Sequence, residues 1–421
     1  MDGMDRMSGT HGTHGSHGSH GTHGTSGAAD RLIGRLEARY AALVADAQRA
    51  GGATTRHAAA WALRVAGAAG AAGDRLHVFG SGEPAFTIVV RDREGLAALR
   101  SLDITAVGEA YLRGAVDVEG ELWRTLALRD LFSDRDLVRR AWHFLRPLFH
   151  GQVASDKYWI AHHYEYPPEF YLLFLDRQYR CYSHGVFARD DEPLESAIAR
   201  KLDFAAEAAG IRPGMRVLDI GGGWGAFVEY GGRRGIHVTS LTISEESERF
   251  IQALIDRQRL PCRVVREHLY EHRPGAPYDA IVNLGVTEHL PDYRATLQIY
   301  ERLLKPGGRI YLDASAARKR HDLSTFLLRY IFPGNGTPLC LHEYLAEVAR
   351  SRFSVAAVHN DRHNYLLTTK HWAQRLEDNR AEIERRWGKA VHRVFQLYLW
   401  GCVDGFLRDT IQAYRVVLEL G

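Results

Sequence analysis

Apolar and polar positions alternate between two periods over the second half of the chain. Short apolar runs typical of buried strands are separated by longer stretches in which apolar residues recur at helical spacing. The strand-like runs are Met215–Ile220, His237–Thr242, Cys262–Glu267, Ala280–Leu284 and Arg309–Asp313, and the helical stretches are Phe227–Arg234, Glu245–Gln258 and Tyr293–Leu304. This alternation predicts an α/β fold with a doubly wound, mostly parallel sheet, which binds ligands at the carboxyl ends of its strands.

The pattern differs in the first part of the chain. Helical spacing of apolar residues covers Arg31–Arg49 and Thr55–Ala69, and the strand-like pieces His77–Phe79 and Phe86–Val90 follow. We therefore expect a smaller N-terminal α+β domain over residues 28–150.

Residues 8–27 repeat His-Gly-Thr or His-Gly-Ser, with histidines at a three-residue period. Such a segment has almost no side chain to bury and cannot offset its loss of conformational entropy on folding. We expect residues 1–27 to be a disordered tail, without a functional metal site.

Residues 151–200 are unusually aromatic and irregular. They are expected to form a cap on a second domain, which would span residues 151–421. The crowded side chains are Tyr158, Trp159, His162, His163, Tyr164, Tyr166, Phe170 and Tyr171.

Composition and charge narrow the function. The chain has 421 residues, 45% of them hydrophobic, and a formal net charge of +3, so no overall charge favours nucleic acid as a partner. The four cysteines form no closely spaced pair, which argues against disulfides and a zinc site. Neither a signal peptide nor a membrane-spanning run is visible, so we expect a cytoplasmic protein, with peripheral attachment to the inner membrane face left open.

A glycine-rich turn follows the first strand of the predicted sheet. Residues 217–225 read Val-Leu-Asp-Ile-Gly-Gly-Gly-Trp-Gly, so a hydrophobic strand runs through Asp219 into Gly221 to Gly223. Glycine has no Cβ and lets the backbone approach a ligand closely. The turn predicts a nucleotide-cofactor site, which could serve a dinucleotide or S-adenosylmethionine.

The second strand distinguishes these cofactors. A dinucleotide site needs an acidic residue about 20 residues after the turn, to bind the ribose. Here the strand ends in Leu241-Thr-Ile-Ser244, and Glu245 and Glu246 belong to the first turn of the next helix, where carboxylates favour the helix dipole. S-adenosylmethionine is therefore predicted over a dinucleotide. Residues 303–313, Leu-Leu-Lys-Pro-Gly-Gly-Arg-Ile-Tyr-Leu-Asp, resemble the late part of class I methyltransferases and support this choice.

Several segments together resemble the cyclopropane-fatty-acyl-phospholipid synthases, the mycolic-acid cyclopropane synthases and related fatty-acid methyltransferases. The resemblance covers roughly residues 100–420 and implies a class I SAM-dependent methyltransferase domain, a Rossmann-like doubly wound sheet, beside the N-terminal domain. The segments are Gly108–Gly114, Val116–Gly120, Val217–Gly225, Leu241–Ser244, Thr287–His289, Tyr330–Pro333 and Phe406–Gln412.

This resemblance implies the reaction. An alkene attacks the sulfonium methyl group and leaves a carbocation on an acyl chain, and loss of a methyl proton closes a cyclopropane. Other relatives quench the cation by hydride shift, hydration or loss of a neighbouring proton. An aromatic cap suits this chemistry because it excludes water and its ring faces stabilise cations.

The resemblance also implies a set of cofactor contacts. In this sequence they are Tyr182 and Ser183 from the cap, Asp219, Gly221 and Gly223 at the methionine end, Thr242 near the ribose, Glu267 and His268 beside the adenine, and Ser247, where relatives often carry glutamine.

In the family a base pocket holds bicarbonate through a cysteine, a glutamate, a histidine and a tyrosine. Glu288 and Tyr365 match the glutamate and the tyrosine, whereas His184 stands at the cysteine position and Asp313 at the histidine position. Cys181 is interpreted as a neighbour of the site, although a shift of one residue in the alignment would make it the ligand.

The carboxylate at 313 changes the expected electrostatics. Two unit charges about 4 Å apart repel by about 4 kcal/mol at an effective dielectric constant of about 20, so bicarbonate should bind poorly beside Glu288 and Asp313. We expect Asp313, alone or with Glu288 and His184, to replace it as the base, with one carboxyl pKa raised by its neighbour. The alternative is that Asp313 only caps a loop at a strand end.

Cys402 matches another family cysteine and is a further catalytic candidate on that basis. Its setting between Val394–Leu399 and Phe406 indicates a buried helix, where free cysteine commonly acts as a small apolar side chain.

We therefore expect an enzyme that acts on an unsaturated phospholipid acyl chain, with peripheral membrane contact through the N-terminal domain. A C-methyltransferase or cyclopropanase for an olefin in a small natural product, and a non-catalytic lipid-binding protein, are the alternatives. A homodimer is among the oligomeric states considered.

Overall fold

The computed structural model describes residues 23–49, 59–69, 73–134, 153, 166–320, 323–332 and 336–421. The chain divides into two compact units. One consists of Met1–Ser101 and Gly114–Gly120, and the other of Leu102–Arg113 and Glu121–Gly421. The first 22 residues of the predicted tail, and five aromatic residues of the predicted cap (Tyr158, Trp159, His162, His163 and Tyr164), lie outside the described residues.

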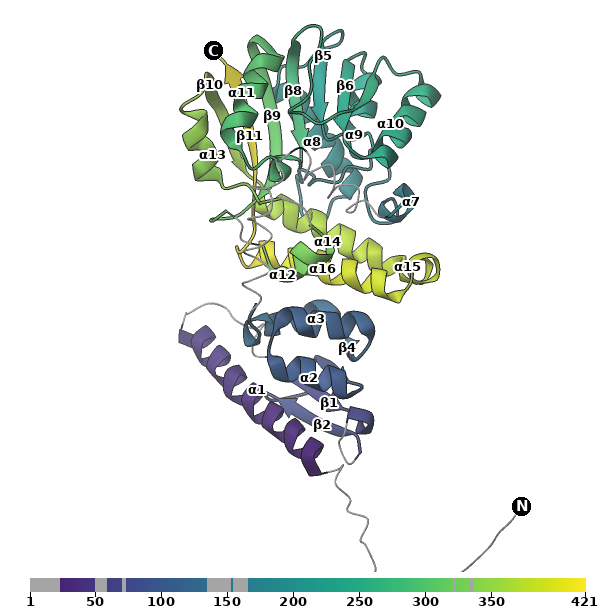
Figure 1. Ribbon diagram of the computed structural model, residues 1–421, viewed down its shortest axis with the longest axis vertical. Helices are drawn as coiled ribbons and strands as arrows, with labels where there is room; N and C mark the ends of the chain where they lie inside the picture. Colours follow the sequence, from purple (N-terminus) through teal and green to yellow (C-terminus); the bar gives the residue numbers. More distant parts are fainter. Residues whose placement is uncertain are drawn as a thin grey trace, which may run out of the picture. The chain divides into compact units, whose positions relative to one another are not determined.

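The first unit is a four-stranded sheet with helices, as the predicted α+β domain requires (Figure 1). The strand order is β2-β1-β3-β4, with β1 and β3 parallel and the other two pairs antiparallel. Trp61 stacks on Phe79 with ring centroids 4.0 Å apart, and Tyr40 of α1 meets both rings edge-on. The elements are α1 (His23–Arg49), β1 (Trp61–Val65), η1 (Gly67–Ala69), β2 (Arg75–Phe79), β3 (Phe86–Val90), α2 (Arg93–Ser101) and β4 (Val116–Gly120).

Two predictions about this unit were wrong. In its described part, the helix expected over Thr55–Ala69 is replaced by strand β1 and the short 3₁₀ helix η1. Ala62 and Leu63 of β1 are fully buried in the sheet, and burial there outweighs the helix propensity of alanine and leucine. The tail ends earlier than expected, since α1 begins at His23 and Ala28, Ala29 and Leu32 are buried on its apolar side.

The second unit is built on a seven-stranded sheet. Its order is β10-β11-β9-β8-β5-β6-β7, and the five strands from β9 to β7 are parallel, while β11 runs antiparallel to both of its neighbours. The doubly wound, mostly parallel sheet is thereby confirmed. The strands are β5 (Arg216–Ile220), β6 (His237–Thr242), β7 (Arg263–Arg266), β8 (Tyr278–Leu284), β9 (Leu304–Ala316), β10 (Phe353–Asn360) and β11 (Gln412–Leu420).

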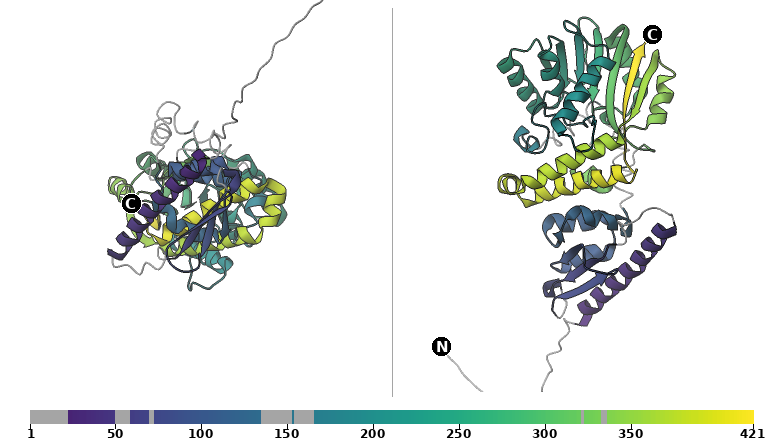
Figure 2. Two further views of the ribbon diagram at one scale, coloured as in Figure 1. Left: turned by 90° about the horizontal axis from the view of Figure 1, so that it is seen from below. Right: turned by 180° about the vertical axis from the view of Figure 1, so that it is seen from behind.

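Successive residues of each central strand face two different hydrophobic cores. Val217 packs into the core with α8, α9 and α10, whereas Leu218 packs into the core with α11 and α13. This alternation places helices on both faces of the sheet (Figures 1 and 2). The helices are α8 (Leu194–Ala208), α9 (Ala226–Gly232), α10 (Glu245–Gln258), η3 (Thr287–His289), α11 (Tyr293–Leu303) and α13 (Leu341–Val348).

The remaining helices of this unit lie outside those two layers. Helices α14 and α16 run side by side, and α15 joins them (Figure 2). These helices are α3 (Ile104–Arg113), α4 (Leu122–Thr125), η2 (Leu126–Leu131), α7 (Pro168–Tyr171), α12 (Thr325–Tyr330), α14 (Arg362–Asp378), α15 (Arg380–Trp387) and α16 (Lys389–Leu407). None of the described helices is long and apolar enough to cross a membrane.

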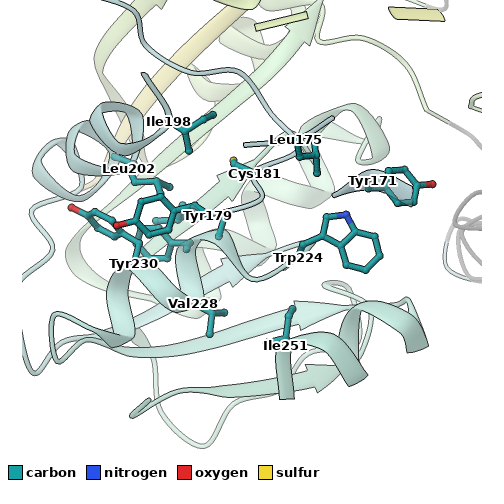
Figure 3. Close-up of a cluster of buried hydrophobic side chains, with 14 of the residues drawn as sticks. Tyr171, Leu175, Tyr179, Cys181, Ile198, Leu202, Trp224, Val228, Tyr230 and Ile251 are labelled. Carbon is teal, nitrogen blue, oxygen red and sulfur yellow. The ribbon is translucent and has the colours of Figure 1, made fainter. Parts of the chain in front are cut away.

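Aromatic side chains at and just after α7, within the predicted cap, are buried. Phe170 and Tyr171 of α7 and the nearby Phe174 are at most 2% exposed, and Tyr171 lies 5.4 Å from Trp224 of the glycine-rich turn, measured between ring centroids. Figure 3 shows Tyr171, Trp224 and Cys181 in one cluster with side chains of α8, α9 and α10. Segments before and after β5 therefore pack together in this core.

Candidate cofactor and base sites

The glycine-rich turn follows β5 where the strand order reverses, between β6 and β8. The amides of Gly221 and Gly222 both donate to the carbonyl oxygen of Leu241, at 2.9 Å, which ties the turn to the end of β6. Gly221 has a φ of +74°, and a Cβ there would lie 2.2 Å from a methyl carbon of Val286. Gly223 has a φ of +52°, and a Cβ there would meet no atom nearer than 3.9 Å. The turn thus needs glycine and leaves one side open.

Asp219 lies on β5, just before this turn. Its side chain is 2% exposed and accepts a 2.7 Å hydrogen bond from the Ser240 hydroxyl of the next strand. Burial raises the pKa of Asp219 to about 6, although Ser240 and the charge of Lys201 oppose the shift. Asp219 therefore supports the turn from the strand side.

Ser247 braces the turn from the other side. Its hydroxyl donates to the carbonyl oxygen of Gly223 at 2.6 Å, while its amide donates to the N-cap hydroxyl of Ser244 at 3.3 Å. The Ser247 hydroxyl therefore donates its hydrogen to the turn and not to a cofactor.

The residues predicted near the ribose and adenine lie together at the ends of β6 and β7. The amide of Glu267 donates to the carbonyl oxygen of Thr242 at 2.9 Å. The Glu267 carboxylate lies 2.7 Å from Nδ1 of His272, and His268 is buried, with Nδ1 accepting from the amide of Tyr270. Thr242, Glu267 and His268 thus border one end of the site.

The segment with Tyr182 and Ser183 is held across the strand ends by Asp176. One carboxylate oxygen of Asp176 accepts from the amide of Tyr179 and the other from the amide of Cys181, both at 2.6 Å. A Cβ on Gly285, at the end of β8, would lie 3.2 Å from the Cβ of Ser183, so the segment rests directly on that strand end. The Tyr182 ring lies against Tyr171, Phe174 and Trp372.

A buried lysine that no sequence pattern indicated lies beside this segment. Lys201 of α8 is fully buried, and its Nζ lies 2.6 Å from Ser183 Oγ, 3.0 Å from Cys181 Sγ and 3.4 Å from Asp313 Oδ2. Asp313 is fully buried as well, and Oδ1 of its carboxylate has no hydrogen-bond partner among the described residues. The charge of Asp313 is therefore compensated, which the repulsion argument from sequence did not include.

Glu288 is held by β9 two residues beyond Asp313. One of its carboxylate oxygens accepts from the Ser315 amide at 2.7 Å and from the Ser315 hydroxyl at 2.9 Å. The other is buried without a hydrogen-bond partner in the part of the chain that the structure describes. Burial, with a contribution from the charge of Asp313, raises the pKa of Glu288 to about 7 despite the hydrogen bonds that oppose it.

Tyr365 stands close to the acidic residues and to His184. Burial and then the nearby charges of Glu288 and Asp313 raise the pKa of Tyr365 well above its usual value. Its ring lies 4.9 Å from that of His184, between centroids. Glu288, Asp313, His184 and Tyr365 therefore lie in one cluster, although His184 is paired with a residue outside it.

That partner is Asp361, a second residue that the sequence analysis missed. His184 Nε2 lies 3.2 Å from Asp361 Oδ2, and Arg415 donates to the same oxygen. Burial would raise the pKa of Asp361, but His184 and Arg415 outweigh it and hold that pKa well below its usual range. An acidic residue just before α14 and an arginine on β11 give no local pattern that could have revealed this arrangement.

Cys402 lies on α16 as expected, but it is half-buried and not fully buried. Burial raises the pKa of its thiol to about 12. The thiol therefore stays protonated near neutral pH, which disfavours a nucleophilic thiolate.

A separate group that could hold a metal ion lies at the start of α13. Its possible ligands are Cys340, His342 and Glu343. The Glu343 carboxylate is already paired with Arg320, and the Cys340 thiol donates to it at 3.4 Å. The contacts of this group are thus satisfied within the protein.

Comparison with known proteins decides what this site serves. The family model described as mycolic acid cyclopropane synthetase matches residues 152–416. The chain belongs to this family. Cyclopropane mycolic acid synthase 3 of Mycobacterium tuberculosis is 31% identical over 281 residues, covering 62% of this chain and 96% of the relative. The cyclopropane-fatty-acyl-phospholipid synthase of Escherichia coli is 30% identical over 278 residues, covering 64% of this chain and 70% of the relative.

A solved structure extends the match to the fold. Mycolic acid cyclopropane synthase CmaA1, complexed with SAH and CTAB, has a TM-score of 0.58 and 26% identity, covering 62% of this chain and 98% of that one. The class I fold that the family resemblance implied is confirmed. The chain is a SAM-dependent methyltransferase, and S-adenosylmethionine is its cofactor.

The residues around the turn fit that cofactor. Gly223 leaves one side of the turn open, Gly221 lets the turn pack against Val286, and Thr242, Glu267 and His268 lie at the neighbouring strand ends. When bound, S-adenosylmethionine supplies an electrophilic methyl group. The individual contacts, including those of Tyr182, Ser183, Asp219 and Ser247, remain predictions.

Proposed function

We propose that this enzyme adds a methyl or methylene group to the double bond of an unsaturated phospholipid acyl chain, through a carbocation on that chain. The observation that carries the proposal is the position of Glu288. A Cβ on Gly221 would lie 2.2 Å from the Val286 side chain, and Glu288 follows Val286 by two residues, so the segment that carries this carboxylate packs against the methyl-donor turn. A base in that place can remove a proton from a substrate that has just been methylated.

The names of the relatives support the lipid substrate. One is a cyclopropane-fatty-acyl-phospholipid synthase and another a cyclopropane mycolic acid synthase. An acyl chain also suits the apolar surroundings of the site, because Tyr171, Tyr182 and Trp372 form an aromatic wall beside it. Such a wall excludes water and favours a nearby cation by roughly 0.5–2 kcal/mol for each ring face.

Within the predicted base cluster, we assign proton removal to Glu288. A general base works best when its pKa lies near the operating pH, and Glu288 has both a raised pKa and one unpartnered oxygen. Ser315 fixes the other oxygen and so orients the carboxylate. Asp313 and His184 already have other partners: Asp313 pairs with Lys201, and His184 Nε2 lies 3.2 Å from Asp361.

The pocket does not fit bicarbonate as a base. The unpartnered oxygens of Glu288 and Asp313 are hydrogen-bond acceptors when ionised, and bicarbonate is an anion with only one hydrogen to donate. Lys201, the cation beside them, already contacts three acceptors. A carboxylate of the chain itself therefore takes the place of bicarbonate in this proposal.

Turnover should accordingly be independent of bicarbonate. We expect the rate in exhaustively degassed buffer to change by less than about twofold when bicarbonate is added, because a base that belongs to the chain needs no exogenous anion. The rates would be measured with and without added bicarbonate at constant pH and ionic strength. A strong bicarbonate requirement would contradict the assignment of the base to the chain.

His184 and Asp313 replace the cysteine and the histidine of the family pattern, which favours a second candidate substrate class, an olefin in a small natural product. Expressing the chain in a host and profiling its lipids separates the two. Acyl chains that gain about 14 Da in a cofactor-dependent manner support the phospholipid proposal. Unchanged lipids, together with methylation of an added small olefin by the purified chain, would favour the alternative.

We further propose that the N-terminal unit docks on lipid. Leu76 and Val78 on edge strand β2 are 60% and 42% exposed and point to the same face of that strand. Single exposed apolar residues are ordinary, but two on one face of an edge strand can enter a lipid interface.

The double substitution Leu76→Asp and Val78→Asp is expected to weaken binding to anionic phospholipid vesicles by about tenfold or more, since it removes apolar contact and adds repelled charges. Sedimentation with vesicles measures this. Val355→Asp, at a 46% exposed position on β10, is the matched control and should bind as the unchanged chain does. Equal loss in both variants would refute docking through β2.

A further inference from the structure

A buried cation is the least expected feature of the second unit. Lys201 is fully buried on α8, where a lysine without an opposite charge would be costly. Burial lowers the pKa of Lys201, but Asp313 and then Cys181 outweigh that effect and raise it above its usual value. The lysine is therefore charged, with its ammonium group directed at Asp313 and Ser183.

The three contacts of Lys201 come from two separate parts of the fold. Cys181 and Ser183 belong to the segment that crosses the strand ends, Asp313 belongs to β9, and Lys201 itself belongs to α8. One side chain thus connects the segment carrying a predicted cofactor contact with the strand that also holds Glu288 through Ser315.

Several other titratable groups face this cluster from the surrounding elements. Asp219 on β5 feels the charge of Lys201, and Tyr311 on β9 lies 3.4 Å from Asp313 Oδ2. The groups to be considered are Asp219, Cys181, Glu288, Tyr311, Asp313, Asp361 with His184 and Arg415, Tyr365, and Tyr398 with Cys402. Of those groups, Arg415 is the other permanent cation, and it is paired with Asp361.

We propose that Lys201 is a positioning residue of the methyl-transfer site. It holds Asp313 as its counter-ion and Ser183 as its hydrogen-bond acceptor, so that Asp313 acts as a structural anion and the proton is left to Glu288. The second half of this statement rests on the proposed function. The proton passes from a substrate carbon to a Glu288 carboxylate oxygen, the C–H electron pair quenches the cation, and Lys201 exchanges no proton.

Removing the charge of Lys201 alone should alter the pH profile of turnover. In Lys201→Met the Asp313 charge is uncompensated and opposes ionisation of Glu288. The acidic limb of the kcat profile should therefore move to higher pH by on the order of one unit, and kcat at pH 7 should fall by about tenfold. Calorimetric binding of S-adenosylmethionine should weaken by about tenfold as well, because Ser183 loses its donor.

The double variant Lys201→Met with Asp313→Asn removes both charges together. It should return the acidic limb to within about 0.3 pH units of the unchanged enzyme and regain most of the Tm that either single variant loses, as expected when both partners of a buried pair are replaced. Lys305→Met, on an exposed lysine that pairs with Asp279, is the control and should change none of these quantities.

Three results would overturn the proposal. The first is a lower kcat in Lys201→Met without movement of the acidic limb, and the second is additive Tm losses in the double variant. The third is loss of turnover in the double variant while Glu288→Gln stays active, which would make Asp313 the base. If the unchanged enzyme makes no lipid product, the proposed function fails, whereas Tm and cofactor binding still test the coupling of residues 201 and 313. If Lys201→Met does not fold, the comparison of Asp313→Asn with the double variant provides that test.

Discussion

Glu288→Gln is expected to lower kcat for lipid modification by about 10²- to 10⁴-fold, the usual contribution of a general base. Glutamine keeps the size of the side chain and can still accept from the Ser315 amide through its carbonyl oxygen, so the pocket should remain formed. Affinity for S-adenosylmethionine should stay within about twofold, because the substitution removes a proton acceptor and not a cofactor contact.

The same residue should set the pH dependence. Burial raises the pKa of Glu288 to about 7, and the base must be ionised to accept a proton. The rate should therefore fall as pH drops below about 7 and level off above it. Measuring kcat and the cofactor Kd across pH 5.5–9 checks both statements, with Glu382→Gln on α15 as an exposed control. A Glu288→Gln enzyme with normal kcat, or one that retains the acidic limb, would show that another group is the base.

Gly221→Ala is expected to weaken S-adenosylmethionine binding by about 100-fold or more. A Cβ there would lie 2.2 Å from a Val286 methyl carbon, and the residue has a φ of +74°, which side chains rarely adopt. The turn or the Val286 segment must shift, and that segment leads directly to Glu288. Both the cofactor site and the base should therefore be disturbed.

The control Gly210→Ala distinguishes the backbone strain of a positive φ from the steric clash with Val286. Gly210 has a similar φ of +65°, but a Cβ there would meet nothing within 4 Å. We expect this control to cost stability only, on the order of 1 kcal/mol, with cofactor affinity unchanged. Calorimetry on both variants measures the difference. Normal binding by Gly221→Ala would mean that the close approach of Gly221 to Val286 has no bearing on the cofactor.

The sheet of the second unit could be predicted because its signals are local. Each strand is a short apolar run bounded by polar residues, and the turn at Gly221 needs residue types that few other structures require. The predicted strand over 237–242 and the helix over 245–258 coincide with β6 and α10 for this reason. The Pro-Gly-Gly turn was also visible, although in the structure it is an irregularity within β9, where Tyr278 pairs with Leu304 and Ala280 with Arg309.

The features that the sequence did not predict depend on contacts between residues far apart in the chain. Strand β1 has the composition of a helix and becomes a strand because β2 and β3 flank it, which the local sequence does not encode. Lys201 lies 112 residues before Asp313, and no spacing rule connects a lysine in an amphipathic helix to a strand-end aspartate. The residues of the base cluster, such as Glu288 and Asp313, could be inferred from family resemblance. Their partners, such as Lys201, could not.

The most direct measurement is the mass of phospholipids after incubation with the purified chain. Vesicles of an unsaturated phospholipid, with S-adenosylmethionine in degassed buffer, should yield a product heavier by about 14 Da. The gain should lie in the acyl chain at the former double bond, with the headgroup unchanged, and vesicles of the saturated lipid should yield none. A chain that binds S-adenosylmethionine yet leaves the unsaturated lipid unchanged, or methylates its headgroup, would contradict the proposed function.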